Sequence, residues 1–407
     1  MKIAVIGTGT AGILSIAFTL AYFDPEQKRV QKILGEKNDW FNLEPVEVYS
    51  IYDPNKAILG IGESTSTQIP SVLSDCIDFS LLENSHELDA TIKLGVKFSN
   101  WRENDFYSHI MPVNYAMHFD NHSIKEYTFN QFRKKYQNFY EILGNVDKLV
   151  SKKESASVIV NDINYNFDYV IDCRGYPDDY TDYDINRNIC LNKCLVYNTK
   201  PKKFNYTHHT ATPNGWMFGI PLQSRLSWGY LYNDTITSTE DAVNNFKTYC
   251  SDIDISKLRE FSFKNYSART FFDGRVLKNG NRALFYEPME AFMGYFYDRV
   301  LRYFFDYVHK NNDINCVNQS IRNISDNIEL ALCFIYYGGS IYNTPFWEYA
   351  KNVSYNKLLN NSKWQDQIKA IKNIKYNHPN RIRMESVGVF PVKSWLDFDK
   401  NLKYNMF

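Results

Sequence analysis

The chain has 407 residues, of which 44% are hydrophobic, and this length suits one large fold or roughly two to three domains. Lysine plus arginine and aspartate plus glutamate number 46 each, so the zero net charge excludes bulk electrostatic attraction to nucleic acid or to an anionic membrane. The chain has 7 cysteines, an odd number, and they are scattered along its length. This pattern favours reduced cysteines in a reducing compartment over a disulfide scaffold.

The first predicted elements are a strand, a tight turn and a helix. An apolar run at 3–6 leads into the glycine-rich segment 7–12, and an apolar helical pattern follows at 13–21. After a charged stretch, a second strand is predicted at 46–52, and Asp53 ends it. This order is typical of the nucleotide-binding half of an α/β fold.

Further along, the pattern changes from mixed to mostly β and then to helical. Residues 81–140 combine helical and irregular segments, and strands are predicted at 156–160 and 169–172. Residues 186–290 are predicted to be mostly β, and a helical pattern begins beyond Ala291. These elements predict an α/β protein with a helical C-terminal part.

Membrane and metal sites are not expected. No apolar run approaches the roughly 18 residues of a membrane span, and the first glycines come too early for a signal peptide. We therefore expect a cytoplasmic protein. Cys190 and Cys194 with His208 and His209 match no standard zinc spacing, so no metal ligand is predicted.

The glycine-rich segment has the context that dinucleotide binding requires, because it follows an apolar strand and opens a helix. Gly7 permits the tight turn, Gly9 lets the backbone approach a pyrophosphate, and Gly12 lets helix and strand pack closely. Thr10 and Ala11 begin the helix, whose N-terminal N–H groups favour phosphates. The segment therefore predicts a nucleotide site.

Two further segments complete the predicted nucleotide site. Asp53, at the end of the second strand, is placed to bind ribose hydroxyls, and Glu47 is less well placed. The segment 168–175, with Asp172 and Gly175, looks like the strand that returns to the nucleotide in two-domain flavoproteins. This second feature favours FAD as the cofactor.

Several separated strings carry the motifs of one family. They are, in chain order, Gly60-Ile61-Gly62-Glu63-Ser64-Thr65, Lys93-Leu94-Gly95-Val96-Lys97-Phe98-Ser99-Asn100-Trp101-Arg102, His118-Phe119-Asp120, Trp216-Met217-Phe218-Gly219-Ile220-Pro221, Phe285-Tyr286-Glu287-Pro288-Met289-Glu290 and Thr344-Pro345-Phe346-Trp347. In motifs and in order, the chain resembles the flavin-dependent tryptophan halogenases and their relatives, from residue 3 to residue 347.

The resemblance implies a Rossmann-like FAD-binding flavoprotein monooxygenase/halogenase fold and a halogenation chemistry. In that family a separate flavin reductase supplies reduced FAD, and O2 and halide then yield hypohalous acid, which crosses a tunnel to a lysine beside the substrate. By motif position Lys93, rather than Lys97, takes this role, as an ammonium that orients the oxidant or as an amine that carries the halogen. Glu290 matches the nearby carboxylate, a candidate base for the proton lost from an aromatic carbon.

The resemblance also assigns the remaining site residues. The loop that packs on the flavin contains Gly62, Glu63, Ser64 and Thr65. The substrate and tunnel region has the motif W-x-W-x-I-P, represented here by Trp216, Phe218 and Pro221, with Phe218 in place of the second tryptophan.

The segment that follows Glu290 departs from the family pattern. The halogenases usually have Ser-Thr-Gly there, and backbone N–H groups of that segment help to hold the halide. This chain has Ala291, Phe292 and Met293, so the backbone donors of Phe292 and Met293 are the corresponding halide ligands. Their side chains change the volume and the accessible backbone conformations, which favours bromide or iodide over chloride or removes the halide site.

The predicted elements and the family resemblance together suggest domain limits and alternative functions. We expect a discontinuous FAD-binding module at 1–300, with a β-rich substrate region inserted at about 100–150 and 180–270, and a mainly helical region at 301–407. The leading hypothesis is an FAD-dependent halogenase that acts on an aromatic or other electron-rich small molecule with a flavin reductase as partner. A flavin-dependent hydroxylase and a degenerate non-catalytic flavin-binding protein are the alternatives, and a homo-oligomer is possible.

Overall fold

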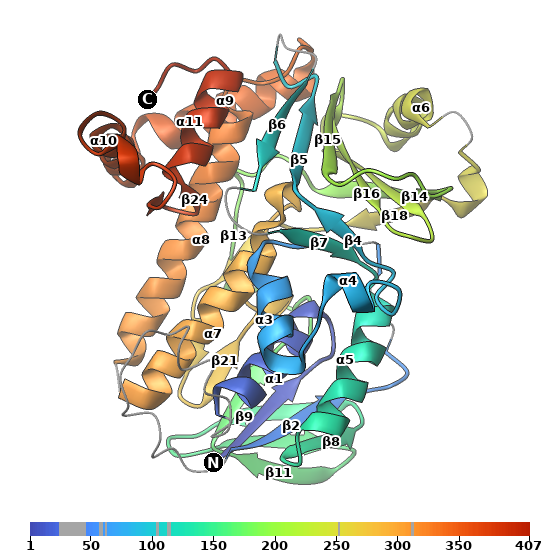
Figure 1. The fold of residues 1–407 in the computed structure, drawn as a ribbon, viewed down its shortest axis with the longest axis vertical. Coiled ribbons are helices and arrows are strands. Elements are labelled where there is room, and N and C mark those ends of the chain that lie inside the picture. Colours follow the sequence, from blue (N-terminus) through green and yellow to red (C-terminus); the bar gives the residue numbers. More distant parts are fainter. Residues whose placement is uncertain are drawn as a thin grey trace.

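A largely parallel β-sheet forms one end of the molecule, at the bottom of Figure 1. The computed structural model describes residues 1–23, 46–56, 60–61, 63–102, 106–111, 115–250, 253–310 and 313–407. The strand order is β20-β21-β12-β1-β2-β8, with antiparallel pairing between β20 and β21. The strands are β1 (Lys2–Ile6), β2 (Glu47–Tyr52), β8 (Phe139–Leu143), β12 (Tyr169–Asp172), β20 (Phe272–Asp273) and β21 (Val276–Lys278).

Both faces of this sheet are covered, which explains why β1 is almost wholly apolar. An antiparallel meander of β9 (Val146–Ser151), β10 (Ala156–Val160) and β11 (Ile163–Phe167) packs on one face, where Ala4 and Ile6 meet Val158. On the other face, Ile3 and Val5 join a core with helices α1 (Thr10–Tyr22), α3 (Gln68–Ile77) and α5 (Asn121–Lys135). Alternate residues of one strand thus serve two cores.

A second large sheet lies at the opposite end, and it is mainly antiparallel (Figure 1). Its order is β18-β14-β17-β16-β15-β5-β6, and β15 and β5 are its parallel neighbours. The strands are β5 (Gly95–Ser99), β6 (Phe106–Ile110), β14 (Lys193–Thr199), β15 (Thr207–Thr212), β16 (Gly215–Pro221), β17 (Leu226–Tyr232) and β18 (Arg259–Ser262), and helix α6 (Thr239–Tyr249) contacts β17.

Small sheets connect the two ends. One is ordered β3-β7-β4, from Glu63–Ser64, Ala116–Phe119 and Thr91–Lys93, and Figure 1 shows β4 and β7 in the middle of the molecule. The other is ordered β13-β19-β22, from Tyr183–Ile185, Tyr266–Ala268 and Leu284–Phe285. Because β4 leads directly into β5, one short segment passes from the central sheet to the second large sheet.

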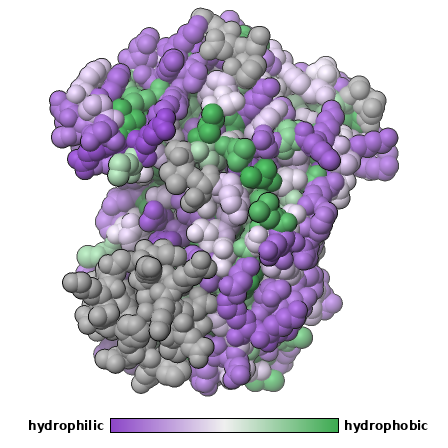
Figure 2. Space-filling model, viewed as in Figure 1, coloured by the Kyte–Doolittle hydropathy of each residue, from purple (hydrophilic) through white to green (hydrophobic). Residues whose placement is uncertain are grey.

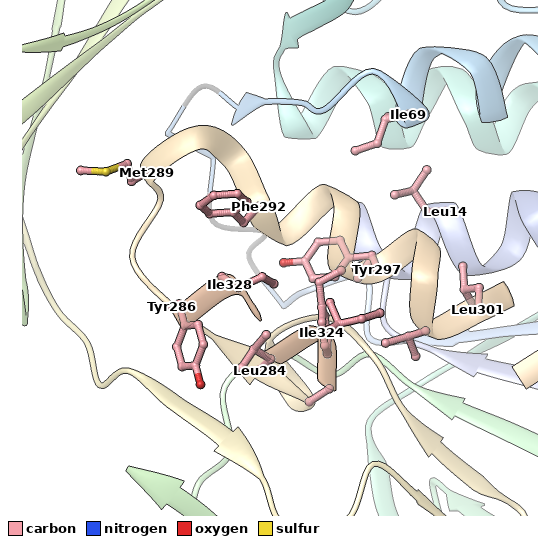
Figure 3. Packing of buried hydrophobic residues seen from close by; sticks show 14 of the residues in the cluster. Leu14, Ile69, Leu284, Tyr286, Met289, Phe292, Tyr297, Leu301, Ile324 and Ile328 are labelled. Atoms are coloured by element: carbon pink, nitrogen blue, oxygen red, sulfur yellow. The ribbon is translucent and has the colours of Figure 1, made fainter. Parts of the chain in front are cut away.

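Helices make up the C-terminal part. Helix α7 (Phe292–Lys310) packs against α1, α3 and α8 (Ile314–Tyr336), and Figure 3 shows Leu14 and Ile69 facing α7 in this core. The later helices are α9 (Pro345–Leu359), α10 (Ser362–Asn377) and α11 (Val392–Asn401), and a hairpin of β23 (Ser386–Val387) and β24 (Phe390–Pro391) precedes α11. Helix α11 contacts β6, so the last helix reaches the second sheet.

The α/β class and the helical C-terminal part predicted from the sequence are confirmed. Within 81–140, however, the structure has the strands β4, β5, β6 and β7 beside helices α4 (Leu81–Asn84) and α5, so the description of that segment as helical and irregular is incomplete. Strand β8, which falls in the expected insert at 100–150, pairs instead with β2 of the parallel sheet. The helical part begins at Phe292, as the pattern beyond Ala291 predicts, although the expected domain limit was 301.

A helix that spans a membrane must be both long and apolar. No helix among the described residues combines the length and apolar character needed to cross a bilayer. On the face drawn in Figure 2, outside the grey atoms, hydrophilic residues predominate, and hydrophobic ones gather mainly in a band across the middle.

Candidate active site

The glycine loop has the tight geometry expected of a nucleotide-binding turn. Gly7 has a φ of 103°, which favours glycine, and a Cβ there would lie 2.5 Å from the carbonyl oxygen of Cys173. A Cβ on Gly12 would lie 2.0 Å from the carbonyl oxygen of Gly7. Both glycines are therefore required by the packing of β1, α1 and β12.

Gly9 differs from Gly7 and Gly12 because its backbone is not crowded. A Cβ on Gly9 would meet no atom of the described chain within 4 Å, so the backbone there borders open space. Gly9 is also the N-cap of α1 and makes no side-chain cap hydrogen bond, so the N–H groups at Thr10 and Ala11 are available to an anion. An open cradle at an uncapped helix N-terminus fits the pyrophosphate of FAD.

The acidic residues at the ends of β2 and β12 differ in their surroundings. Asp53 follows β2 at the carboxyl end of the parallel strands, where the glycine loop also lies, and it is half-buried. Glu47 lies at the opposite end of β2 and forms an ion pair with Lys2. Asp172 is buried, and its carboxylate accepts hydrogen bonds from the Arg174 side chain at 2.9 and 2.8 Å.

Asp172 has a second cationic neighbour, because Arg282 Nε lies 3.3 Å from its Oδ2. Its carboxylate therefore holds two arginines. Gly175, three residues on, has a φ of 87° and no atom of the described chain within 4 Å of an added Cβ. A cofactor can thus approach the backbone of Gly175 more closely than the carboxylate of Asp172.

The segment assigned to the flavin loop forms the short strand β3. Glu63 and Ser64 pair with Phe119 and His118 of β7. Thr65 is fully buried, and its N–H donates to the carbonyl of Met117 at 2.9 Å. Gly62 lies outside the described residues.

Lys93 ends β4 and is 1% exposed, so it is a buried strand residue and not a solvated helix residue. Its Nζ donates to Ser64 Oγ at 2.8 Å and to the carbonyl oxygen of Thr65 at 3.1 Å. Burial lowers the pKa of Lys93 to about 8, and the negative charge of Glu290 opposes this shift. A substantial fraction of Lys93 is therefore a neutral amine near pH 8.

Glu290 is buried near Lys93 and binds a histidine. Its Oε2 lies 2.9 Å from His109 Nδ1, and His109 Nε2 lies 2.8 Å from Ser394 Oγ of α11. Burial raises the pKa of Glu290, but the charge and hydrogen bond of His109 outweigh burial and leave the pKa below its usual value. The other oxygen, Oε1, has no hydrogen-bond partner in the described part of the chain. Glu290 thus has one oxygen available for a proton.

The backbone at Glu290 turns the chain into α7. Glu290 and Ala291 have φ values of 58° and 55°, in the left-handed region that non-glycine residues rarely occupy. Phe292 then starts α7, and Figure 3 shows its ring on the first turn, where it is 5% exposed. The N–H groups of Phe292 and Met293 therefore belong to the first turn of α7, which directly follows a 3-10 turn at Met289–Ala291.

The residues assigned to the substrate and tunnel region lie on the buried strand β16. Trp216 is fully buried, and its Nε1 donates to the hydroxyl of Tyr336 at 2.8 Å. That hydroxyl donates in turn to Glu287 at 2.6 Å, and burial raises the pKa of Glu287 to about 8. Phe218 lies on the same side of the strand, with its ring centroid 6.3 Å from that of Trp216.

Pro221 contributes its carbonyl oxygen, which accepts from Thr91 Oγ1 at 2.6 Å. The structure thus brings Lys93, Ser64 and Thr65 into contact and places Glu290 within electrostatic reach.

Sequence reasoning missed several residues of this site. His109 and Ser394 bind Glu290 in series, while His118 and Thr207 extend the contacts of Ser64. His118 stood in a family motif, whereas Ser394 had no local signal, because it lies far from its partners in the sequence. The described residues contain no group of His, Cys, Asp or Glu suited to hold a metal ion.

Comparisons with known proteins identify the family of this chain. The model of the tryptophan halogenase family matches residues 2–137 and 103–398. Tryptophan 7-halogenase RebH of Lentzea aerocolonigenes is 20% identical over 440 residues, which cover 86% of this chain and 79% of RebH.

Solved structures share the fold. The tryptophan halogenase from Shewanella frigidimarina NCIMB 400 has a TM-score of 0.77 at 17% identity, over 99% of this chain and 88% of that one. BrvH, a flavin-dependent halogenase from Brevundimonas sp. BAL3, has a TM-score of 0.78 at 13% identity, over 99% and 89% of the two chains. The chain belongs to the tryptophan halogenase family and is a flavin-dependent halogenase.

Proposed function

We propose that this enzyme halogenates a small aromatic or otherwise electron-rich molecule with hypohalous acid that Lys93 directs to the reacting carbon. The observation that carries the proposal is the buried amino group of Lys93, held by Ser64 and Thr65 with Glu290 nearby. A buried lysine that forms no ion pair with the described residues is costly, and such perturbed groups are common in active sites.

The glycine loop and the segments around it would hold FAD. Gly9 offers open space to the pyrophosphate, α1 directs its N-terminus to it, and Asp53 lies at the ribose end of β2. Reduced FAD, when bound, supplies with O2 the oxidising power that converts halide into hypohalous acid. A separate flavin reductase is the source of the reduced cofactor.

Lys93 has two ways to direct the oxidant. As an ammonium it donates a hydrogen bond to hypohalous acid and orients it, and as an amine it accepts the halogen. Burial, which lowers the pKa of Lys93 to about 8, makes both forms accessible near neutral pH. Glu290 Oε1 then accepts the proton that the aromatic carbon loses, and His109 holds the other oxygen.

The halide would bind at the start of α7. The N–H groups of Phe292 and Met293 lie on the first turn, where the helix dipole favours anions. The aromatic and thioether side chains suit a large, polarisable and weakly hydrated anion. Bromide and iodide are therefore expected to react better than chloride.

One assay tests the activity and the halide preference together. The protein is incubated with FAD, a flavin reductase, NADH, O2 and a panel of aromatic compounds that includes free tryptophan, with chloride, bromide and iodide separately and in equal mixture. We expect halogenated masses, more of them with bromide or iodide than with chloride. Chloride as the best substrate would contradict the halide assignment.

The same assay distinguishes the alternatives. Oxygenated products that form without halide would establish the hydroxylase instead. FAD binding without any product across the panel and the three halides would favour the non-catalytic protein. A protein that does not bind FAD would overturn both the proposal and these alternatives.

A further inference from the structure

The central sheet aligns a row of polar side chains with Lys93. Ser64 of β3 lies opposite His118 of β7, and His118 lies opposite Thr91 of β4. Directly opposed residues of neighbouring strands project from the same face of a sheet. Lys93 is two residues beyond Thr91 on the same strand, so its side chain projects from that face as well.

The hydrogen bonds along this row fix the tautomer of His118. Thr91 Oγ1 donates its one proton to the carbonyl oxygen of Pro221, because that oxygen can only accept. The contact of 3.0 Å between Thr91 Oγ1 and His118 Nδ1 therefore has Nδ1 as its donor. Burial and the charge of Lys93 hold the pKa of His118 well below its usual value, so the ring is neutral and Nε2 is an acceptor.

The same counting fixes every hydroxyl between His118 and Lys93. Thr207 Oγ1 lies 2.9 Å from His118 Nε2 and must donate to it. With that proton used, Thr207 accepts from Ser64 Oγ at 3.2 Å. Ser64 has then used its own proton, so towards Lys93 it acts as an acceptor at 2.8 Å. All donors in this chain of hydrogen bonds point from Lys93 to His118.

The direction of these bonds determines which part of the Lys93 amine is engaged. Ser64 Oγ and the carbonyl oxygen of Thr65 both accept from Nζ. A neutral amine has two N–H bonds and one lone pair, so these two acceptors bind both hydrogens. The lone pair then points away from Ser64 and Thr65. A Ser64 hydroxyl turned the other way would instead donate to the lone pair and block it.

We propose that His118, acting through Thr207 and Ser64, is a positioning residue that keeps the lone pair of Lys93 unengaged for reaction with hypohalous acid. This inference rests on the proposed function and adds a role for residues that do not touch the oxidant. In the step concerned, the nitrogen lone pair attacks the halogen and a nitrogen–halogen bond forms. The oxygen–halogen bond breaks with its electrons on oxygen, and the departing hydroxide takes one amine proton to give water.

The test uses the fact that the chain can be broken at Thr207 or His118 and repaired at Ser64. Thr207→Val removes the acceptor of the Ser64 proton, so that hydroxyl turns and donates to the Lys93 amine. His118→Leu leaves Thr207 without its acceptor and has the same consequence. Ser64→Ala, combined with either change, removes the blocking donor. Thr207→Ser keeps the hydroxyl and is the matched control.

The first readout is the rate of carbamylation of Lys93 by cyanate, followed by peptide mass spectrometry on the full-length, FAD-loaded protein. This reaction needs a neutral amine with an available lone pair and does not depend on halogenation. We expect Thr207→Val and His118→Leu to slow it about fivefold, the effect of one hydrogen bond, with Thr207→Ser close to the unaltered protein. Carbamylation of the partly exposed Lys97 in the same samples reports general damage.

The second readout is the rate of product formation in the halogenation assay. Thr207→Val and His118→Leu should lower this rate as they lower the cyanate rate, and Ser64→Ala should restore the cyanate rate in both backgrounds, a rescue that a merely structural role does not produce. Unchanged Lys93 reactivity in Thr207→Val, or a double variant slower than Thr207→Val alone, would overturn the inference. If the unaltered protein makes no halogenated product but the cyanate results hold, the proposed function fails and the hydrogen-bond direction stands.

Discussion

The two candidate sites of this enzyme, the glycine loop and the surroundings of Lys93, differ in the groups that form them. At the glycine loop the backbone forms the site, and a Cβ on Gly9 would meet no atom of the described chain within 4 Å. Around Lys93, which is 1% exposed, side chains contribute as well, because Ser64 Oγ and the Glu290 carboxylate lie near its amino group together with the carbonyl oxygen of Thr65. The loop is therefore sensitive to volume, whereas the lysine site is sensitive to charge and hydrogen bonding. A larger residue in the glycine loop should abolish FAD binding, whereas substitutions around Lys93 should lower turnover by amounts that depend on the group removed.

The largest effect is expected in the glycine loop, where the volume of a side chain determines whether FAD can bind. Gly9→Val places a branched side chain in the space that the pyrophosphate of FAD needs, so FAD binding should be abolished while the chain stays folded. Flavin titration followed by fluorescence measures the affinity, and circular dichroism checks the fold. An unchanged affinity would show that the loop is only a structural turn.

Lys93→Ala should act on the second site alone. Product formation should fall by about a hundredfold or more, because the oxidant is no longer positioned, while FAD binding and flavin reoxidation by O2 stay nearly intact. Lys93→Arg should not restore the rate, since a guanidinium is larger, planar and always charged. Flavin absorbance and product mass are followed together, with Lys97→Ala as control. Near-normal product from Lys93→Ala would make this lysine a bystander.

The cost of burying Lys93 should be measurable as stability. Its pKa is about 8 in the folded chain and about 10.4 when unfolded, so the folded state binds fewer protons between these values and stability rises with pH there. Lys93→Met should therefore raise the free energy of unfolding at pH 7, by at most about 3 kcal/mol, since the hydrogen bonds of Lys93 are lost as well.

This stability gain should shrink as the pH rises through the same window. Denaturant unfolding of the two proteins at pH 7, 9 and 10.5 tests it, with Lys97→Met as the control for a partly exposed lysine. A difference that does not change with pH would show that Lys93 titrates normally.

The smallest of these effects is expected at Glu290. Glu290→Gln should lower turnover about tenfold, less than Lys93→Ala, if the carboxylate takes up the product proton or tunes the lysine. Glu290 raises the pKa of Lys93, so its removal should lower that pKa and shift the corresponding limb of the pH–rate profile to lower pH. The measurement is kcat against pH. A loss as large as that of Lys93→Ala would give Glu290 a more direct part in the reaction.

Local patterns made the glycine turn predictable. An apolar strand, a glycine turn and a helix are contiguous in the sequence, so the roles of Gly7, Gly9 and Gly12 in the turn follow from neighbouring residues alone. Lys93 was identified by a motif, but its strand was missed because β4 spans only Thr91–Lys93, too short to show a period of two.

Contacts between distant segments were not predictable. The hydrogen bond between His109 and Ser394 joins residues 285 positions apart, and no sequence pattern near either residue predicts it. The direction of the bonds between Lys93 and His118 depends on which proton each hydroxyl has used, and this requires the side-chain positions of separate strands. Asp172 carried a plausible motif, yet its carboxylate binds Arg174 and Arg282.

The bond between His109 and Ser394 gives the site an order of assembly during protein synthesis. Ser394 lies on α11, which is made long after the glycine loop and Lys93 have left the ribosome. A nascent chain that ends before α11 can close the nucleotide turn but cannot hold His109 from both sides. The contacts around Glu290 are therefore completed later than the glycine turn, when α11 docks and Ser394 meets His109.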